Sequence, residues 1–111
     1  MGSANSSTRS VVMGGATPPT TDIMEYFTTA TTGNATDFGD LTTATRQPAK
    51  GLASNTTIGL FVSGYNSPNY YNTIEKITIA STSNAADFGD TIGARSEAGA
   101  ASNGHGGLVG G

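Results

Sequence analysis

The sequence of 111 residues contains no cysteine and no tryptophan, and only 12% of its residues are charged. Without cysteine the chain can form neither disulfides nor thiolate metal ligands, and the redox compartment cannot be deduced from it. The five Lys and Arg residues do not cluster, and the net charge is −3 with a pI of about 4.7. A chain without a basic patch is not expected to bind nucleic acid or an anionic membrane surface.

Long apolar runs and helical periodicity are also absent. No apolar run approaches the length of a transmembrane helix, and the N-terminal MGSANSSTRS has no signal-peptide core. Apolar residues make up 35% of the chain, whereas Thr, Ser, Asn and 16 Gly are abundant. This composition is typical of turns and β-strands. We therefore expect a single all-β domain over residues 1–111.

The chain does contain an internal repeat. Residues 22–40 read DIMEYFTTATTGNATDFGD, and residues 72–90 read NTIEKITIASTSNAADFGD. Asp37 and Asp87 are separated by an offset of 50, and no gap interrupts the alignment. Recurring units of this size are typical of folds in which each unit buries its apolar face against the next.

The repeat sets the expected organisation of the chain. Repeat 1 covers about residues 10–59, repeat 2 about residues 60–106, and a partial third repeat covers residues 107–111. The first strand of each repeat, residues 10–14 and 60–64, is also aligned at the offset of 50. The two GNATDFGD-like segments, residues 31–40 and 81–90, are polar and rich in glycine, so we expect them to be turns.

Short apolar or β-branched runs between turn signals predict nine strands. They cover residues 10–15, 23–29, 41–46, 50–54, 60–64, 73–80, 91–95, 97–102 and 106–111. Four short strands in each unit of about 50 residues are typical of a β-propeller blade. The expected fold is thus two four-stranded blades plus one extra strand per chain.

The order of landmarks in each unit carries a family resemblance. A Gly-Gly pair ends one strand at Gly14-Gly15, with Gly64-Tyr65 and Gly110-Gly111 as counterparts, and an arginine, Arg46 or Arg95, closes a later strand. This order resembles the kelch repeat of β-propellers. The spacing around GNATDFGD is similar to kelch-like repeats in uncharacterised proteins of marine and freshwater bacteriophages.

The resemblance implies a propeller and suggests a virion or an extracellular assembly as its setting. The tryptophan of kelch repeats is absent, and Phe38 and Phe88 stand nearest to its packing position. The resemblance implies a structural role for Arg46 and Arg95, which would donate hydrogen bonds to turn carbonyls or to a glutamate of a neighbouring blade.

Two blades cannot close a propeller, because propellers need roughly four to eight. The open ends would expose strands and apolar faces, and self-association would cover them. We expect a homo-oligomer: a trimer with six blades is preferred, and a larger ring or a filament stays open. The expected function is a non-enzymatic structural or binding module. The alternatives are an engineered or cropped propeller fragment, and a propeller glycosidase or oxidase.

One loop combines aromatic and amide side chains that suit a ligand. It contains Tyr65, Tyr70 and Tyr71 together with Asn66 and Asn69. Tyrosine rings can stack on the apolar faces of sugars while asparagines supply hydrogen bonds, which predicts a glycan-binding loop. The alternative is that the tyrosines pack at a blade junction or in a subunit interface.

The remaining polar residues do not form a pattern that is typical of a catalytic site. Asp37 and Asp40, like Asp87 and Asp90, are paired carboxylates in Gly-containing segments, where Ca²⁺ binding or shaping of the turn are the two interpretations. Two carboxylates are few for a strong calcium site, so shaping of the turn is favoured. His105 is the only histidine and has no histidine or cysteine partner. We therefore expect no catalytic residue, no metal and no cofactor.

Overall fold

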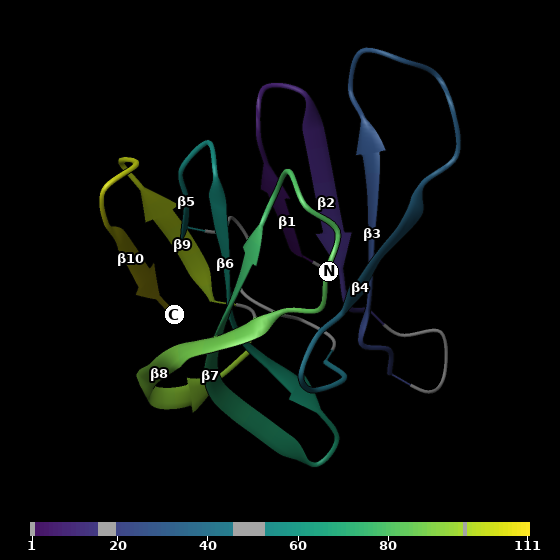
Figure 1. The fold of residues 1–111 in the computed structure, drawn as a ribbon. Coiled ribbons are helices and arrows are strands. Elements are labelled where there is room, and N and C mark those ends of the chain that lie inside the picture. The colour runs from purple at the N-terminus through teal and green to yellow at the C-terminus, as the bar shows by residue number, and fades with distance from the viewer. Residues whose placement is uncertain (1, 16–19, 46–52, 97) are drawn as a thin grey trace.

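The computed structural model of the protein describes residues 2–15, 20–45, 53–96 and 98–111. These residues form ten β-strands and no helix (Figure 1). The strands are β1 (Gly2–Asn5), β2 (Arg9–Met13), β3 (Ile23–Thr28), β4 (Thr36–Asp40), β5 (Ala53–Ser54), β6 (Ile58–Asn66), β7 (Asn69–Thr78), β8 (Ala86–Arg95), β9 (Gly99–Ser102) and β10 (Gly107–Gly110). The expected all-β fold is confirmed.

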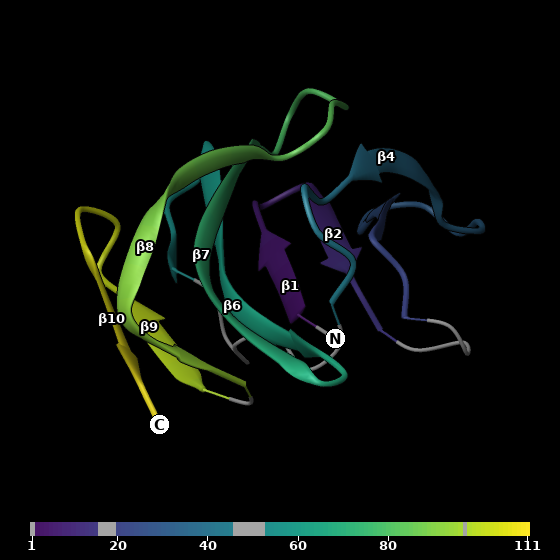
Figure 2. The same cartoon turned by 90° about the horizontal axis from the view of Figure 1, so that it is seen from below.

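The strands form three antiparallel sheets. The first sheet has the order β1-β2-β3-β4, the second has β5-β6-β7-β8, and β9 pairs with β10 as a hairpin. Figure 2 shows the sheets following one another across the molecule, with the hairpin at one end and the first sheet at the other. In β3, Met24 is buried while Ile23 and Glu25 on the other face are exposed, as the alternating sequence predicts.

The two predicted four-stranded sheets are confirmed, but the strands that compose the first sheet and the number of additional strands differ from the prediction. The first sheet has an outer strand of its own, β1, which pairs with β2 in the register Gly2↔Met13. The C-terminal addition is a two-stranded hairpin. The short GSAN segment of β1 has no strand pattern in its sequence. It joins the sheet through backbone pairing and through Ala4, which is buried.

The predicted turns over residues 31–40 and 81–90 are also partly wrong. Their DFGD segments are strand residues, in β4 and in the first half of β8. In the first repeat the expected strand over residues 41–46 is replaced by irregular chain from Leu41 to Thr45. The predicted strand residues 46, 50–52 and 97 lie outside the described residues.

The two repeats differ by one residue in their strand register. In the first sheet Val12 pairs with Glu25, and in the second Phe61 pairs with Glu75. The glutamates are 50 positions apart, but Val12 and Phe61 are only 49 apart. A bulge in β6 after this pair absorbs the extra residue. The offset of 50 predicted between residues 10–14 and 60–64 is therefore wrong by one residue on the N-terminal side of this bulge.

The hydrophobic core lies mainly between the first two sheets. Its members are buried aliphatic and aromatic side chains from both repeats, among them Val11, Met13, Met24, Phe38, Phe61, Ile77 and Ile79. The two sheets approach closely where Ala4 faces Gly59. A Cβ added to Gly59 would lie 2.6 Å from the Ala4 Cβ, so the packing requires glycine there.

Candidate functional site

One hydrogen-bonded contact between the repeats is made at the DFGD segment of the first sheet. The Asp40 backbone N–H donates to Asn84 Oδ1 over 3.0 Å, and the Ala85 N–H donates to the Asp40 carbonyl over 2.8 Å. Two residues further on, the Thr42 N–H donates to Oε1 of Glu75, which is buried. Main-chain groups of the first repeat are thus bound by an Asn, an Ala and a Glu of the second.

A glycine and a phenylalanine complete this contact. Gly39 has a φ of +141°, and an added Cβ would collide with the backbone of Ser83 and Asn84. Phe38 is 2% exposed, and its ring meets Tyr26 edge-on with the centroids 6.0 Å apart. The DFGD sequence therefore supplies a buried anchor and a close backbone approach at the same place.

Arg9 links the same two sheets at a second point. Its guanidinium donates to the carbonyl of Ile79 over 3.0 Å and lies 4.2 Å from the centroid of the Tyr26 ring. A charged donor on a backbone carbonyl, combined with a cation–π contact, makes this a strong local connection.

Counterparts of these residues recur at the two outer surfaces, where the described part of the chain leaves most of them exposed. Gly89, with a φ of +154°, has no atom within 4 Å of an added Cβ, and Phe88 is 57% exposed. Glu25, Asn34 and Ala35, the counterparts of the three residues that bind the first DFGD segment, are exposed. The chain thus has two different open surfaces, and each carries one half of the contact found between its repeats.

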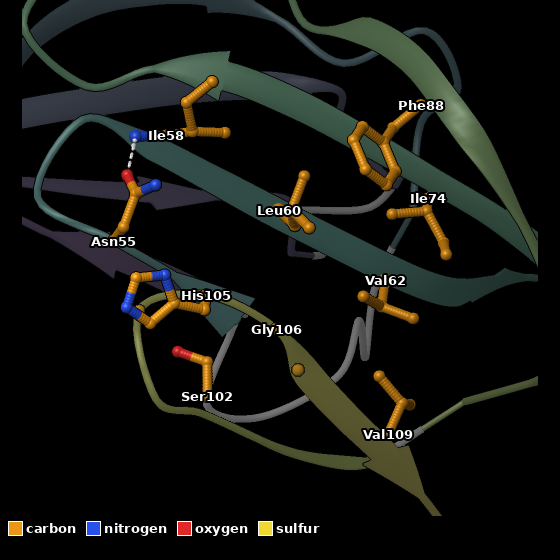
Figure 3. Close-up of a pocket in the computed structure, with 12 residues that line it drawn as sticks. Asn55, Ile58, Leu60, Val62, Ile74, Phe88, Ser102, His105, Gly106 and Val109 are labelled. Carbon is orange, nitrogen blue, oxygen red and sulfur yellow. Dashed lines mark hydrogen bonds between the residues drawn. The ribbon is translucent and has the colours of Figure 1, made fainter.

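A cavity of about 330 Å³ lies between the second sheet and the β9–β10 hairpin (Figure 3). Its wall is mostly apolar, and polar side chains gather at one end. The apolar lining comprises Ile58, Leu60, Val62, Ile74, Phe88 and Val109, and the polar end comprises Asn55, Ser102 and His105. Figure 3 shows His105 and Ser102 on the hairpin side, opposite the β6 side chains. The hairpin therefore covers this face incompletely.

The predicted ligand-binding residues lie on the hairpin formed by β6 and β7. Tyr65 pairs with Tyr70 and Asn66 with Asn69 on either side of the turn. The Tyr65 and Tyr70 rings contact each other, with centroids 4.7 Å apart and an interplanar angle of 48°. Tyr71 follows Tyr70 directly in the strand and so faces the opposite side. The structure brings together two of the three tyrosines.

The other polar residues singled out from the sequence are spread over the molecule. Among the described residues, no group of three or more His, Asp and Glu side chains gathers in the way that a metal ion requires. Arg95 donates to the carbonyls of Gly93 and Gly111, and Arg46 lies outside the described residues. No described residue belongs to a helix long and apolar enough to cross a membrane.

Comparison of the chain with protein-family models and with curated protein sequences gives no match. Support for a function therefore comes from the geometry of the chain itself.

The contact between the repeats is not among the predicted features, although the sequence contains a signal for it. Between residues 22–40 and 72–90, five of the residues that make this contact are identical in both copies. They are Glu25 and Glu75, Asn34 and Asn84, Ala35 and Ala85, Gly39 and Gly89, and Asp40 and Asp90. Identity between the two copies thus includes residues that join one sheet to the next.

Proposed function

We propose that the chain is a non-enzymatic structural module that assembles with copies of itself through stacked β-sheets. The observation that carries this proposal is the pair of open surfaces. One exposes Phe88 and leaves open space where a Cβ of Gly89 would lie, and the other exposes Glu25, Asn34 and Ala35. When an exposed surface carries the same residues as a contact inside the molecule, association with another copy can cover it in the same way.

The kelch-like resemblance gives this assembly a specific form. Each four-stranded sheet would serve as a blade, and the succession of the two sheets within one chain supports this form (Figure 2). Three chains with two such sheets each would supply six blades, within the roughly four to eight of known propellers. A larger ring, or a filament if the rotation does not close, uses the same contact. A phage virion or an extracellular assembly is the setting that the resemblance implies.

Light scattering coupled to size exclusion, at several protein concentrations, tests the proposal. The chain has a mass of 11.1 kDa, and we expect a multiple of this mass that increases or reaches a plateau with concentration. A plateau at three times the monomer mass supports the six-bladed ring. A monomer at every concentration would contradict assembly and favour the alternative of a fragment without a function of its own.

A second function, carbohydrate binding, is favoured by the ring contact between Tyr65 and Tyr70. Tyr70 is exposed at the tip of a long hairpin, and Asn66 and Asn69 flank the turn beside it. A pair of rings with amides alongside suits the apolar face and the hydroxyls of a sugar.

A glycan array with the full chain tests this second function. Tyr70→Ala is expected to abolish binding, whereas Tyr71→Ala, which removes a ring from the opposite side of the same strand, should leave it unchanged. Equal binding by the wild-type protein and Tyr70→Ala would remove the hairpin from consideration.

A further inference from the structure

We infer that the first sheet of one copy docks onto the β8 side of the second sheet of another copy, in the register of the contact between the repeats. The inference rests on the proposed assembly and identifies its partner and its contact residues. The template is the interface within the chain, in which Asn84, Ala85 and Glu75 bind the main chain at Asp40 and Thr42.

The β8 side of the second sheet has the features of the receiving half. Its DFGD segment is identical in sequence to the one that is bound within the chain. Gly39 is a glycine because the backbone of the next repeat passes where its Cβ would lie, and Gly89 is also a glycine with a positive φ but with empty space at that position. Phe88 is largely exposed, whereas its counterpart Phe38 is buried.

The outer face of the first sheet has the features of the inserting half. Glu25 and Ala35 are exposed, whereas their counterparts Glu75 and Ala85 are buried against the first DFGD segment. Phe27 is 41% exposed on the same face, and its counterpart Ile77 is in the core. Covering this face would therefore bury an apolar side chain as well as form hydrogen bonds.

The repeat fixes the register of the contact. Asn34 Oδ1 would accept from the Asp90 N–H, and the Ala35 N–H would donate to the Asp90 carbonyl. The Glu25 carboxylate would accept from the Ile92 N–H. These are the three hydrogen bonds of the internal interface, each moved by one repeat.

The incoming sheet requires the β9–β10 hairpin to move aside. Within the chain, β1 packs against β5 and β6, and β5 packs against β9 and β10 in the corresponding way. A docked copy brings its own β1–β2 hairpin to the place of β9–β10. We expect the β9–β10 hairpin to be displaced by the incoming β1–β2 hairpin, because β9–β10 is packed less tightly. It leaves the cavity of about 330 Å³ beneath it, and Leu108 is 80% exposed. By contrast, Val11 and Met13 of β2 are fully buried.

Disulfide trapping tests the register directly, because the chain has no cysteine of its own. Asn34→Cys and Asp90→Cys would be prepared as separate full-length variants, mixed and oxidised. We expect a covalent dimer on a non-reducing gel, since the two positions become neighbours only in the docked pair. The matched control is Asn34→Cys mixed with Asp40→Cys, because the Asp40 N–H is already bound by Asn84 of its own chain. Equal dimer yields in the two mixtures, or no dimer in either, would overturn the inference.

A pair of one-sided variants tests the same contact without cross-linking. Phe88→Glu blocks the receiving half, and Ala35→Arg blocks the inserting half. Both positions are exposed, so each variant should keep the wild-type unfolding midpoint. Each variant alone should have the monomer mass, because one half of the contact is blocked in every copy. In an equimolar mixture, the intact inserting half of Phe88→Glu can bind the intact receiving half of Ala35→Arg. The mixture should therefore reach twice the monomer mass and no more.

The outcomes separate this inference from the proposed function. If the wild-type protein assembles and both variants assemble equally well, assembly stands and the docking register is wrong. A mixture of the two variants that stays monomeric also overturns the register. If the wild-type protein is a monomer at every concentration, both the proposed assembly and the register fail.

Discussion

Phe38 and Phe88 occupy the same position of the same DFGD segment, yet one is 2% exposed and the other 57%. Their neighbours in sequence are identical, and both segments are strands. The difference in exposure comes from the sheet or hairpin that packs next to each segment. The second sheet covers Phe38, whereas only a two-stranded hairpin follows the second sheet. Burial in this repeat is thus decided by what stacks on each unit, and the comparison can be tested position by position.

The largest effect is expected at the two phenylalanines. Phe38→Ala should lower the free energy of unfolding by about 3–5 kcal/mol, because it removes a fully buried ring from the core. Phe88→Ala should lower it by less than about 1 kcal/mol, since an exposed side chain contributes little. Urea denaturation monitored by circular dichroism, at a concentration where the protein is monomeric, measures both. Similar losses in the two variants would show that Phe88 is covered in solution.

The two glycines should show an intermediate difference. Gly39 and Gly89 both have a positive φ, so alanine at either position introduces backbone strain of about 1–3 kcal/mol. Gly39→Ala should cost about 1–3 kcal/mol more, because its Cβ would overlap the backbone of Ser83 and Asn84. Gly89→Ala serves as the control for strain alone. Equal unfolding free energies for the two variants would mean that the close approach at Gly39 carries no energetic weight.

The smallest difference is expected at the two asparagines. Asn84→Ala removes the acceptor of the Asp40 N–H and should cost about 0.5–1.5 kcal/mol. Asn34→Ala should leave the stability of the monomer unchanged, because the Asn34 side chain makes no such hydrogen bond to the described residues of its own chain. Asn84→Asp keeps an acceptor oxygen and should retain most of the stability. If Asn84→Ala has the same urea midpoint as the wild-type protein, this hydrogen bond does not contribute to the stability of the contact between the repeats.

The sequence was sufficient for the all-β class, the internal repeat and the positions of most strand centres, because β-branched runs between glycine turns specify strands locally. It was insufficient for β1, since Gly2–Asn5 carries no strand pattern and becomes a strand only by pairing with β2. The DFGD segments were predicted as turns, because their polar residues are typical of turns. In the structure they are strand residues, and the main chain of the first segment forms hydrogen bonds with the other repeat.

The candidate site was predicted less well, for a similar reason. The contact of Tyr65 with Tyr70 depends on the pairing of β6 with β7 around a two-residue turn, which the sequence analysis had placed in a loop. The one-residue difference in register between the repeats comes from a bulge in β6, and a gap-free alignment cannot show it. Features set by neighbouring layers or by strand pairing escape local sequence patterns.

The order of strands within each sheet bears on how the chain folds. Every strand pairs with a neighbour in the sequence, so each sheet is a meander. The β1–β2, β5–β6 and β9–β10 hairpins turn at Ser6, Asn55 and Asn103, whose side-chain oxygens accept hydrogen bonds from the backbone two and three residues later. Short loops close on a submicrosecond timescale and hairpins form within about 1–10 μs. Because local pairings precede distant ones at low entropic cost, each sheet is expected to form early, and docking of one preformed sheet on the next is the slow step of folding.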